Sequence, residues 1–233
     1  PSEVLVAQLP FPEQIVIEPI ATPTLIAIPI PTPIPSPTRT PTTVSWPPPG
    51  QILFVSDRDN SGGDLYTIST TGGNIRRLTT MGAYEPSYTV SNGGQIIFTS
   101  QHDQRASIYR LAMSENTVTN LTGFNSDNWE PAISADSRKI AFVSSRDNLD
   151  WEVYTMNIDG TSIIRLTKDD PARNTMPAWS PDGNQIAFVT YEGCTDTWCP
   201  SSLRLMAADG TAMRKIYAVE GKTARHPTWS PDG

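Results

Sequence analysis

A short apolar pentapeptide recurs four times along the chain at nearly constant spacing. Its central phenylalanine stands at Phe54, Phe98, Phe142 and Phe188, at steps of 44, 44 and 46 residues. A second marker, a proline, gives the same period at Pro86, Pro131, Pro177 and Pro227, at steps of 45, 46 and 50 residues. A repeat in the forties made of short β-type runs is typical of a propeller, in which each repeat forms one four-stranded sheet called a blade.

The residues inside one repeat indicate its four strands. Pro-Ala-Trp-Ser at 177–180 leads through the turn Pro-Asp-Gly-Asn into the run 186–190, and Pro and Gly suit the two halves of such a turn. The run is apolar on both faces, as expected for a sheet between two neighbouring blades. Asp-Gly turns at 159–160 and 209–210 precede a fourth strand. Its arginines, such as Arg77 and Arg165, suit an outer edge that must not pair with another molecule.

The repeats predict an all-β fold, a β-propeller of four-stranded blades at 51–233. We expect the blades at approximately 51–79, 85–122, 130–167 and 176–217, with the start of the next at 226. The first copy lacks an opening strand, unless residues 46–50 are a degraded version of one. The strand at 226–230 could complete that first blade and close a ring of four. We favour an open part of a larger ring in a longer protein, because the sequence stops inside a Pro-Asp-Gly turn.

Residues 1–50 have the composition of a linker rather than of a folded domain. Fourteen of the 22 prolines fall in this stretch, which carries only four charged residues. Closely spaced prolines hold a chain near polyproline II, which makes a semi-rigid spacer. The apolar run at 14–30 contains Glu18 and three prolines, whereas a membrane span needs about 20 mostly apolar helical residues. We therefore expect a Pro/Thr-rich disordered linker without a membrane span, typical of exported proteins.

The consensus of the repeat resembles a known family. The string Pro-x-Trp-Ser-Pro-Asp-Gly-x-x-Ile-Ala-Phe-x-Ser-x-Arg-Asp, followed by Ile/Val-Tyr-x-Met-x-x-Asp-Gly and Arg-Leu-Thr, resembles the WD-like, PD-type repeat of TolB β-propellers over residues 51–233. The second copy departs most, because Ser114-Glu115-Asn116 replaces its Asp-Gly turn. The resemblance implies that these repeats are part of a six-bladed ring. It also implies a periplasmic or extracellular binding scaffold, or a substrate-gating domain attached to a serine peptidase.

Charge and residue content exclude several classes of function. The formal net charge is −7, from 24 acidic and 17 basic side chains, so the chain lacks the excess of basic residues that nucleic-acid binding needs. Only His102 and His226 are present, which leaves no His-rich metal site and few candidates for a triad. No Gly-x-Ser-x-Gly elbow, phosphate-binding Gly-rich loop or His-Glu-x-x-His motif occurs in the sequence. We therefore expect neither catalysis by these residues nor a cofactor.

Asp-rich loops follow the second strand of two repeats, at 57–64 and 146–150. Their carboxylates do not follow the twelve-residue calcium loop with its closing Glu. Asp and Asn side chains also stabilise hairpin turns by bonding to the backbone. We therefore expect turn structure and no metal ion, and the family resemblance implies that an Arg-Asp pair within the repeat fixes the loop.

In a propeller, the loops between consecutive blades lie around the mouth of the central channel. The predicted binding residues precede the repeated proline in these loops, and they are Tyr84, Glu85, Trp129, Glu130, Arg173, Met176, Arg225 and His226. Aromatic and Arg side chains are the usual anchors of protein interfaces, so we predict a mouth that binds protein or peptide. The alternative is structural, with the aromatic rings packed between blades and the Glu side chains bonded to loop amides.

The two cysteines, Cys194 and Cys199, stand five positions apart in the longest hairpin loop, at 192–202. Two cysteines without a nearby His cannot supply the four ligands of a zinc site. In an exported chain, a local disulfide that pins this loop is the favoured interpretation. Trp198 in the same loop either makes contact with a partner or covers the bridge.

Together these features predict a non-catalytic extracytoplasmic binding scaffold of a bacterium, periplasmic, secreted or at the cell surface. It would recognise protein or peptide at the channel mouth. Two alternatives depend on sequence outside residues 1–233. One is the gating propeller of a serine peptidase, and the other is the sensor ectodomain of a membrane-anchored kinase or regulator. A serine elbow downstream or a membrane helix upstream would separate these three functions.

Overall fold

The computed structural model describes residues 50–59, 62–81, 83–91, 93–102, 105–147, 150–168, 172–194 and 199–233, except the side chains of 83–86 and 102. By its internal contacts the chain divides into two units, Pro1–Pro41 and Thr42–Gly233. Every described residue belongs to the second unit. The linker predicted for 1–50 lies outside the described residues apart from Gly50, and it stays a prediction.

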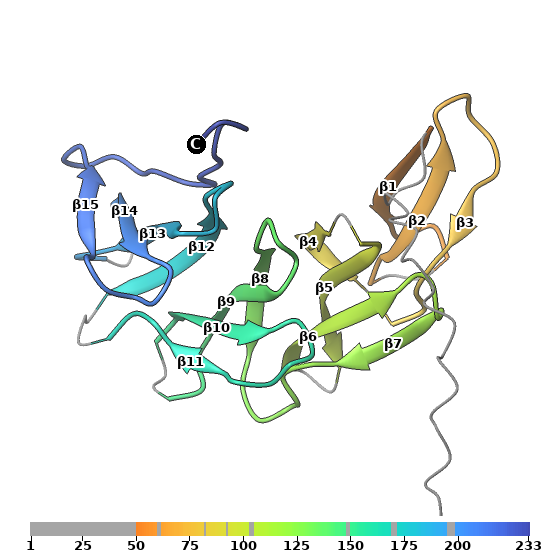
Figure 1. Cartoon of the computed structure of the whole chain (residues 1–233), viewed down its shortest axis with the longest axis horizontal. Coiled ribbons are helices and arrows are strands. Elements are labelled where there is room, and N and C mark those ends of the chain that lie inside the picture. The colour runs from red at the N-terminus through yellow and green to blue at the C-terminus, as the bar shows by residue number, and fades with distance from the viewer. Residues whose placement is uncertain are drawn as a thin grey trace, which may run out of the picture. The chain divides into compact units, whose positions relative to one another are not determined.

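Every regular element of the described part is a strand, and the strands form four antiparallel sheets that follow one another in chain order (Figure 1). Blade 1 contains β1 (Gln51–Ser56), β2 (Asp64–Ser69) and β3 (Arg76–Arg77). Blade 2 contains β4 (Ala83–Val90), β5 (Gln95–His102), β6 (Arg105–Ala112) and β7 (Thr117–Asn120). Blade 3 contains β8 (Asn128–Ile133), β9 (Lys139–Ser144), β10 (Glu152–Asn157) and β11 (Ile164–Arg165). Blade 4 contains β12 (Arg173–Trp179), β13 (Gln185–Tyr191), β14 (Ser201–Ala207) and β15 (Arg214–Tyr217).

The strands of each blade pair in sequence order, so β4, β8 and β12 form one edge of their sheets and β7, β11 and β15 form the other. We call the first strand of each full blade its inner strand. Blade 1 has three strands among the described residues, and they match the second to fourth strands of the other blades. The predicted all-β architecture of propeller blades is confirmed. The described part contains no helix with the length and hydropathy to cross a bilayer.

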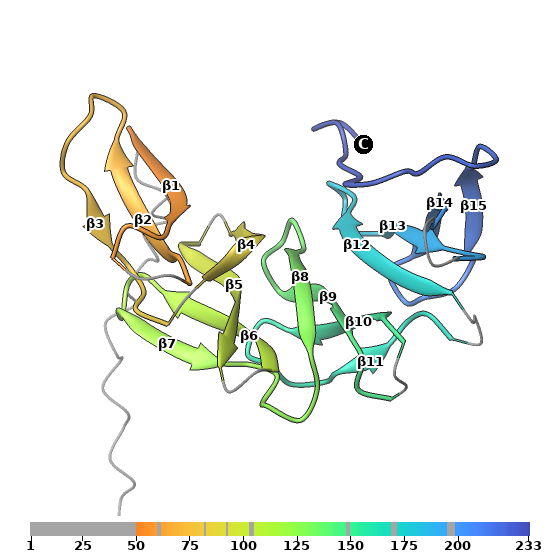
Figure 2. The same cartoon turned by 180° about the vertical axis from the view of Figure 1, so that it is seen from behind.

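Neighbouring blades pack through alternate residues of their second strands. On β9, Ile140 and Phe142 join a core with Ile97 of blade 2, whereas Ala141 joins another core with Phe188 of blade 4. All five side chains are buried. Blade 3 lies between blades 2 and 4 in both views (Figures 1 and 2). Because both faces of β9 are covered, the strand is apolar throughout instead of alternating.

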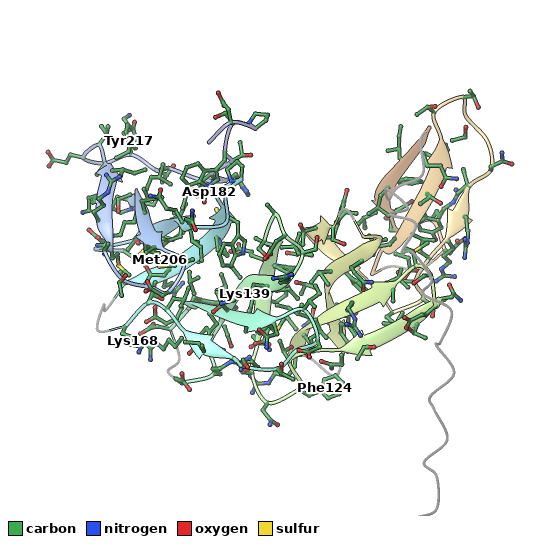
Figure 3. All side chains as sticks on the ribbon, in the orientation of Figure 1. Phe124, Lys139, Lys168, Asp182, Met206 and Tyr217 are labelled. Carbon is green, nitrogen blue, oxygen red and sulfur yellow. A yellow bond between two sulfur atoms is a disulfide. The ribbon has the colours of Figure 1, made fainter. Side chains whose placement is uncertain are left out.

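The Pro-Asp-Gly turn between β12 and β13 is held by the carboxylate of Asp182, which Figure 3 labels. Its Oδ1 atom accepts hydrogen bonds from the Ser180 hydroxyl and from the amide of Asn184, at 2.5 and 3.0 Å. These bonds lower the pKa of Asp182 because they stabilise its ionised form. The turn therefore closes the hairpin through side-chain bonds to the backbone, as Asp turns commonly do.

The Arg-Asp loop of blade 3 is fixed through a tyrosine. The Tyr154 hydroxyl donates to Asp147 Oδ2 at 2.7 Å, and the guanidinium of Arg146 lies 5.1 Å from the centre of the Tyr154 ring. Arg146 also donates to the Asn128 side chain at 2.9 Å. Arg146 and Asp147 thus hold the loop of blade 3 through separate contacts with Tyr154.

The arginines of the outer strands make buried contacts that the sequence did not predict. Arg165 of β11 donates to Glu152 Oε1 at 2.6 Å, and Thr167 donates to Oε2 of the same carboxylate. Glu152 is 1% exposed, so the arginine neutralises a buried charge. In blade 1, Arg77 pairs with buried Asp64 in the same way. The Arg-Leu-Thr motif therefore binds an acidic residue inside the blade, in addition to marking an edge strand.

Residues 226–230, predicted as the next opening strand, pair with no strand of the described part. Blade 4 shows the paired form of this motif, in which the Pro-Asp-Gly turn at 181–183 leads from β12 into β13. The segment still keeps one contact and one backbone conformation of its repeat. The Trp229 indole donates to the carbonyl oxygen of Ala178 at 3.1 Å, and His226 has a φ of 52°.

Candidate binding site

The inner strands β8 and β12 each contain a bulge at the repeated proline. On β8, Trp129 pairs with Val143 and Ala132 with Ala141, so Glu130 and Pro131 oppose the single residue Phe142. The pairing of β12 shifts in the same way between Thr175 and Ala178. Proline has no N–H, and bulges at sheet edges tolerate that loss. The edge position of the inner strand therefore explains why every repeat places a proline there.

The residue before the repeated proline has a left-handed backbone at three positions. The φ angles are 53° at Glu130, 53° at Met176 and 52° at His226. Such values are uncommon for residues other than glycine. Because the three side chains differ, the conformation belongs to the repeated position rather than to one residue type. At Glu130 and Met176 that position lies in the bulge.

The side chain of one such residue bonds to the amide of the next. Glu130 Oε2 accepts a hydrogen bond from the Met176 amide at 2.6 Å. The Met176 sulfur in turn accepts from the His226 amide at 3.3 Å. We call this series the bulge relay. It links successive blades, and its first bond is the kind of loop-amide contact that the structural alternative anticipated for Glu130.

The bulge relay lines a cavity of about 350 Å³, which we call the axial cavity. Residues of blades 2, 3 and 4 meet there, including Ser87, Glu130 and Met176, together with His226. Burial raises the pKa of Glu130, and the Met176 amide and His226 oppose that rise. The structure therefore brings three of the predicted residues to one place on the inner strands.

A second cavity, also of about 350 Å³, lies between blades 3 and 4 and shares Glu130 with the first. We call it the aromatic cavity. Its lining includes the rings of Trp129, Trp151 and Tyr191 and the side chains of Arg173 and Arg225. The centres of the two indole rings lie 6.3 Å apart with their planes tilted. Three predicted residues besides Glu130 thus converge, and the volume suits a small ligand site.

Strand pairing explains how the aromatic cavity forms. Trp129 is paired with Val143, and Arg173 with Tyr191. The buried Asn174 joins the two blades. Its backbone N–H donates to the Trp151 carbonyl oxygen at 2.7 Å, and its side-chain Nδ2 donates to Glu152 Oε2 at 3.0 Å. Asn174 thereby fixes the start of β12 against the segment that carries Trp151.

Sequence reasoning missed Trp151, Tyr191 and Asn174. The only sequence signal for the last is the pattern Asn-x-x-Pro, which occurs at 128–131 and again at 174–177. Trp151 precedes β10 and Tyr191 ends β13, away from the repeated proline. Tyr84 and Glu85 lie on β4, and their side chains, like that of His102, are outside the described part.

The Cys194 and Cys199 sulfur atoms are joined in the structure, with Cα atoms 4.1 Å apart. Cys199, one of the two bridged residues, lines the aromatic cavity. Trp198 lies outside the described residues. Within the described ranges, no group of three or more His, Cys, Asp or Glu side chains could hold a metal ion.

Repeated four-stranded sheets, with bulged inner strands at one edge and cavities beside the bulges, define the class of this protein as a β-propeller. The chain belongs to the PD40 family, described as the TolB beta propeller domain, which matches residues 39–233. The resemblance predicted from the repeat is confirmed.

Three similar proteins illustrate the relationship. An uncharacterized protein of Agrobacterium fabrum is 30% identical over 196 residues, which cover 80% of this chain and 65% of the relative. An uncharacterized peptidase of Bacillus subtilis is 32% identical over 111 residues, which cover 45% of this chain and 16% of the relative. The solved structure of a putative TolB from Agrobacterium tumefaciens is 26% identical with a TM-score of 0.68, covering 79% of this chain and 68% of that one. The chain therefore spans less than two thirds of the length of the two curated relatives, from Agrobacterium fabrum and Bacillus subtilis.

Proposed function

We propose that this protein is a non-catalytic binding scaffold outside the cytoplasm, and that it holds a protein or peptide at the aromatic cavity. The observation that carries the proposal is the convergence of Trp129, Trp151 and Tyr191 with two arginines in one cavity. Trp, Tyr and Arg are the side chains that most often dominate the energy of protein interfaces. Membership of the TolB family supports both the extracytoplasmic location and a binding role.

The similarity to a peptidase of Bacillus subtilis favours a second candidate function. In that case the same cavity would admit substrates to a hydrolase domain elsewhere in the protein. Both candidates use the cavity to bind peptide and differ in the fate of the bound peptide, which is either held or cleaved. A hydrolase domain in the same polypeptide would decide for the second.

The experiment is a selection of peptides from a random display library on the immobilised chain, followed by affinity measurement with labelled peptides. Trp129→Ala is expected to weaken binding by at least about tenfold, as loss of an interface hot spot does. The matched control is Tyr217→Ala, because Tyr217 is 52% exposed on the outermost strand β15 (Figure 3). This control should bind as the unchanged chain does.

Thermal unfolding of each variant separates binding from folding. Trp129→Phe keeps an aromatic ring beside Trp151 and should unfold as the unchanged chain does, with intermediate affinity. Failure to select any peptide, or equal affinity of the Trp129→Ala and Tyr217→Ala variants, would contradict the proposed function.

A further inference from the structure

Two arginines that line the aromatic cavity, Arg173 and Arg225, do not belong to the ion pairs that stabilise the blades. Arg173 is the first residue of β12, and Arg225 lies two residues before the repeated Pro227. Within the described residues, neither takes part in an ion pair. Arg165, by contrast, is occupied by the carboxylate of Glu152. The cavity therefore presents two guanidinium groups from two separate segments, both available for an anion.

The charge of the cavity favours such an anion. Among its described lining residues the only carboxylate is that of Glu130, which already accepts a hydrogen bond from the Met176 amide. Burial also raises the pKa of Glu130, which favours its neutral form. The lining is thus cationic in a chain whose formal charge is −7. Arg binds carboxylates with two parallel hydrogen bonds, which adds geometric selectivity.

The remaining wall suits an apolar group next to the anion. The indoles of Trp129 and Trp151 form one side. Thr175 also lines the cavity, and its hydroxyl oxygen is buried without a hydrogen-bond partner among the described residues.

We propose that the aromatic cavity captures the C-terminal residue of a peptide, with its α-carboxylate between Arg173 and Arg225 and a bulky apolar side chain against the two indoles. A C-terminal residue is the part of a peptide that carries a carboxylate and a side chain on the same carbon atom. A cavity of about 350 Å³ suits a chain end. This inference rests on the proposed function and names the ligand class of its site.

The test measures binding to the full chain by calorimetry, with N-acetyl-Ala-Leu as the probe. N-acetyl-Ala-leucinamide is the matched probe without the carboxylate. The free acid should bind at least about tenfold more tightly than the amide, because charge-assisted hydrogen bonds are the strong ones. The difference should vanish in Arg173→Met and Arg225→Met, which keep most of the apolar stem. It should persist in Arg138→Met, since Arg138 is exposed and does not line the cavity.

Two further probes distinguish other sources of an anion. N-acetyl-Glu-leucinamide supplies a carboxylate only on a side chain, and galacturonate supplies one on a sugar. Binding of either as tightly as the free dipeptide would overturn the assignment to a C-terminal residue. Equal binding of acid and amide would overturn the carboxylate inference and leave the proposed function intact, provided the selected peptides still depend on Trp129. Absence of any peptide binding would defeat the proposed function itself.

Discussion

The indole nitrogen of Trp179 donates a hydrogen bond to the carbonyl oxygen of Ala132, 3.1 Å away across the boundary between blades 3 and 4. The equivalent residues one repeat later, Trp229 and Ala178, make the same bond at the same distance. In these two repeats the tryptophan of the Pro-x-Trp-Ser motif thus fixes its own segment to the preceding inner strand.

Replacing Trp179 by Phe should lower the free energy of unfolding by about 1 kcal/mol for the lost hydrogen bond, and by more because the smaller phenyl ring leaves space in the core. Urea unfolding measures the change. Trp179→Ala should cost about 3–5 kcal/mol, because Trp179 is 9% exposed and packs in the core between the two blades. An unchanged midpoint for Trp179→Phe would show that the bond does not stabilise the blade boundary.

Glu152→Ala should be among the most damaging substitutions. It removes the acceptor shared by Arg165, Thr167 and Asn174. The expected loss is at the lower end of the roughly 3–5 kcal/mol that breaking a buried ion pair costs, since the Arg165 side chain remains 18% exposed to water. Chemical unfolding of Glu152→Ala and of the exposed control Glu220→Ala gives the comparison. Equal stability of the two variants would refute a structural role for the Arg-Leu-Thr motif.

Gly210 and Gly72 form a matched pair for testing the contact between blades. Both have positive φ, 86° and 77°, so alanine is strained at either position by about 1–2 kcal/mol. A Cβ atom at Gly210 would also lie 3.0 Å from the Leu166 carbonyl oxygen of blade 3, whereas one at Gly72 meets no atom within 4 Å. Gly210→Ala should therefore lose more stability than Gly72→Ala by roughly 1 kcal/mol or more. Equal losses would mean that the two blades can move apart at no cost.

The stability contribution of Glu130 should depend on pH. Burial raises its pKa above the ordinary value of 4.5, so the protonated side chain favours the folded state. That contribution is complete below the ordinary pKa and is lost as the pH rises through the raised one. Glu130→Gln stays neutral and can still accept from the Met176 amide. Its stability relative to the unchanged chain should therefore increase between pH 4 and pH 8.

Thermal unfolding across that pH range measures this effect. Glu130→Ala is the informative second variant, because it also removes the acceptor of the Met176 amide and should be destabilising at every pH. A constant difference between Glu130→Gln and the unchanged chain would argue against a buried, titrating carboxylate in the bulge relay.

The bond between Cys194 and Cys199 should survive purification without reductant. After denaturation, a thiol-alkylating reagent should modify neither cysteine until the chain is reduced, and both afterwards. Mass spectrometry of the tryptic peptide that contains them reads the result. Alkylation of both residues before reduction would show that the loop at 192–202 is not bridged.

The sequence allowed the blades to be predicted because their second strands are buried on both faces, which leaves a continuous apolar run around Phe142 and its equivalents. It also placed Trp129, Arg173 and Arg225 near one another, since repeated positions occupy equivalent places in repeated sheets. The sequence did not predict that Trp151 and Tyr191 line the same cavity. Tyr191 reaches the cavity through its pairing with Arg173 inside blade 4, and Trp151 through the bond between its carbonyl and the Asn174 amide. Neither contact leaves a mark at a fixed offset from the proline.

The left-handed conformation of the residue before the repeated proline could not be predicted from the sequence either. Glu, Met and His are not residue types that indicate a left-handed backbone, and the residue before a proline usually prefers an extended backbone. In blade 3, Ser137 has a φ of 59° at the turn position where blade 4 has Gly183. Glycine therefore marks only some of the positions that need a positive φ.

The bulge relay has a direction. Glu130 reaches forward to Met176, and Met176 reaches forward to His226. In both bonds a side chain accepts from the backbone N–H of the equivalent residue in the next repeat. Every residue except proline has such an N–H. The units therefore join in one direction along the chain, and a junction does not need a specific pair of side chains. Duplication of one unit would add one junction of the same kind, in which a side-chain acceptor meets a backbone amide, so a gene could gain or lose blades without a new rule of pairing.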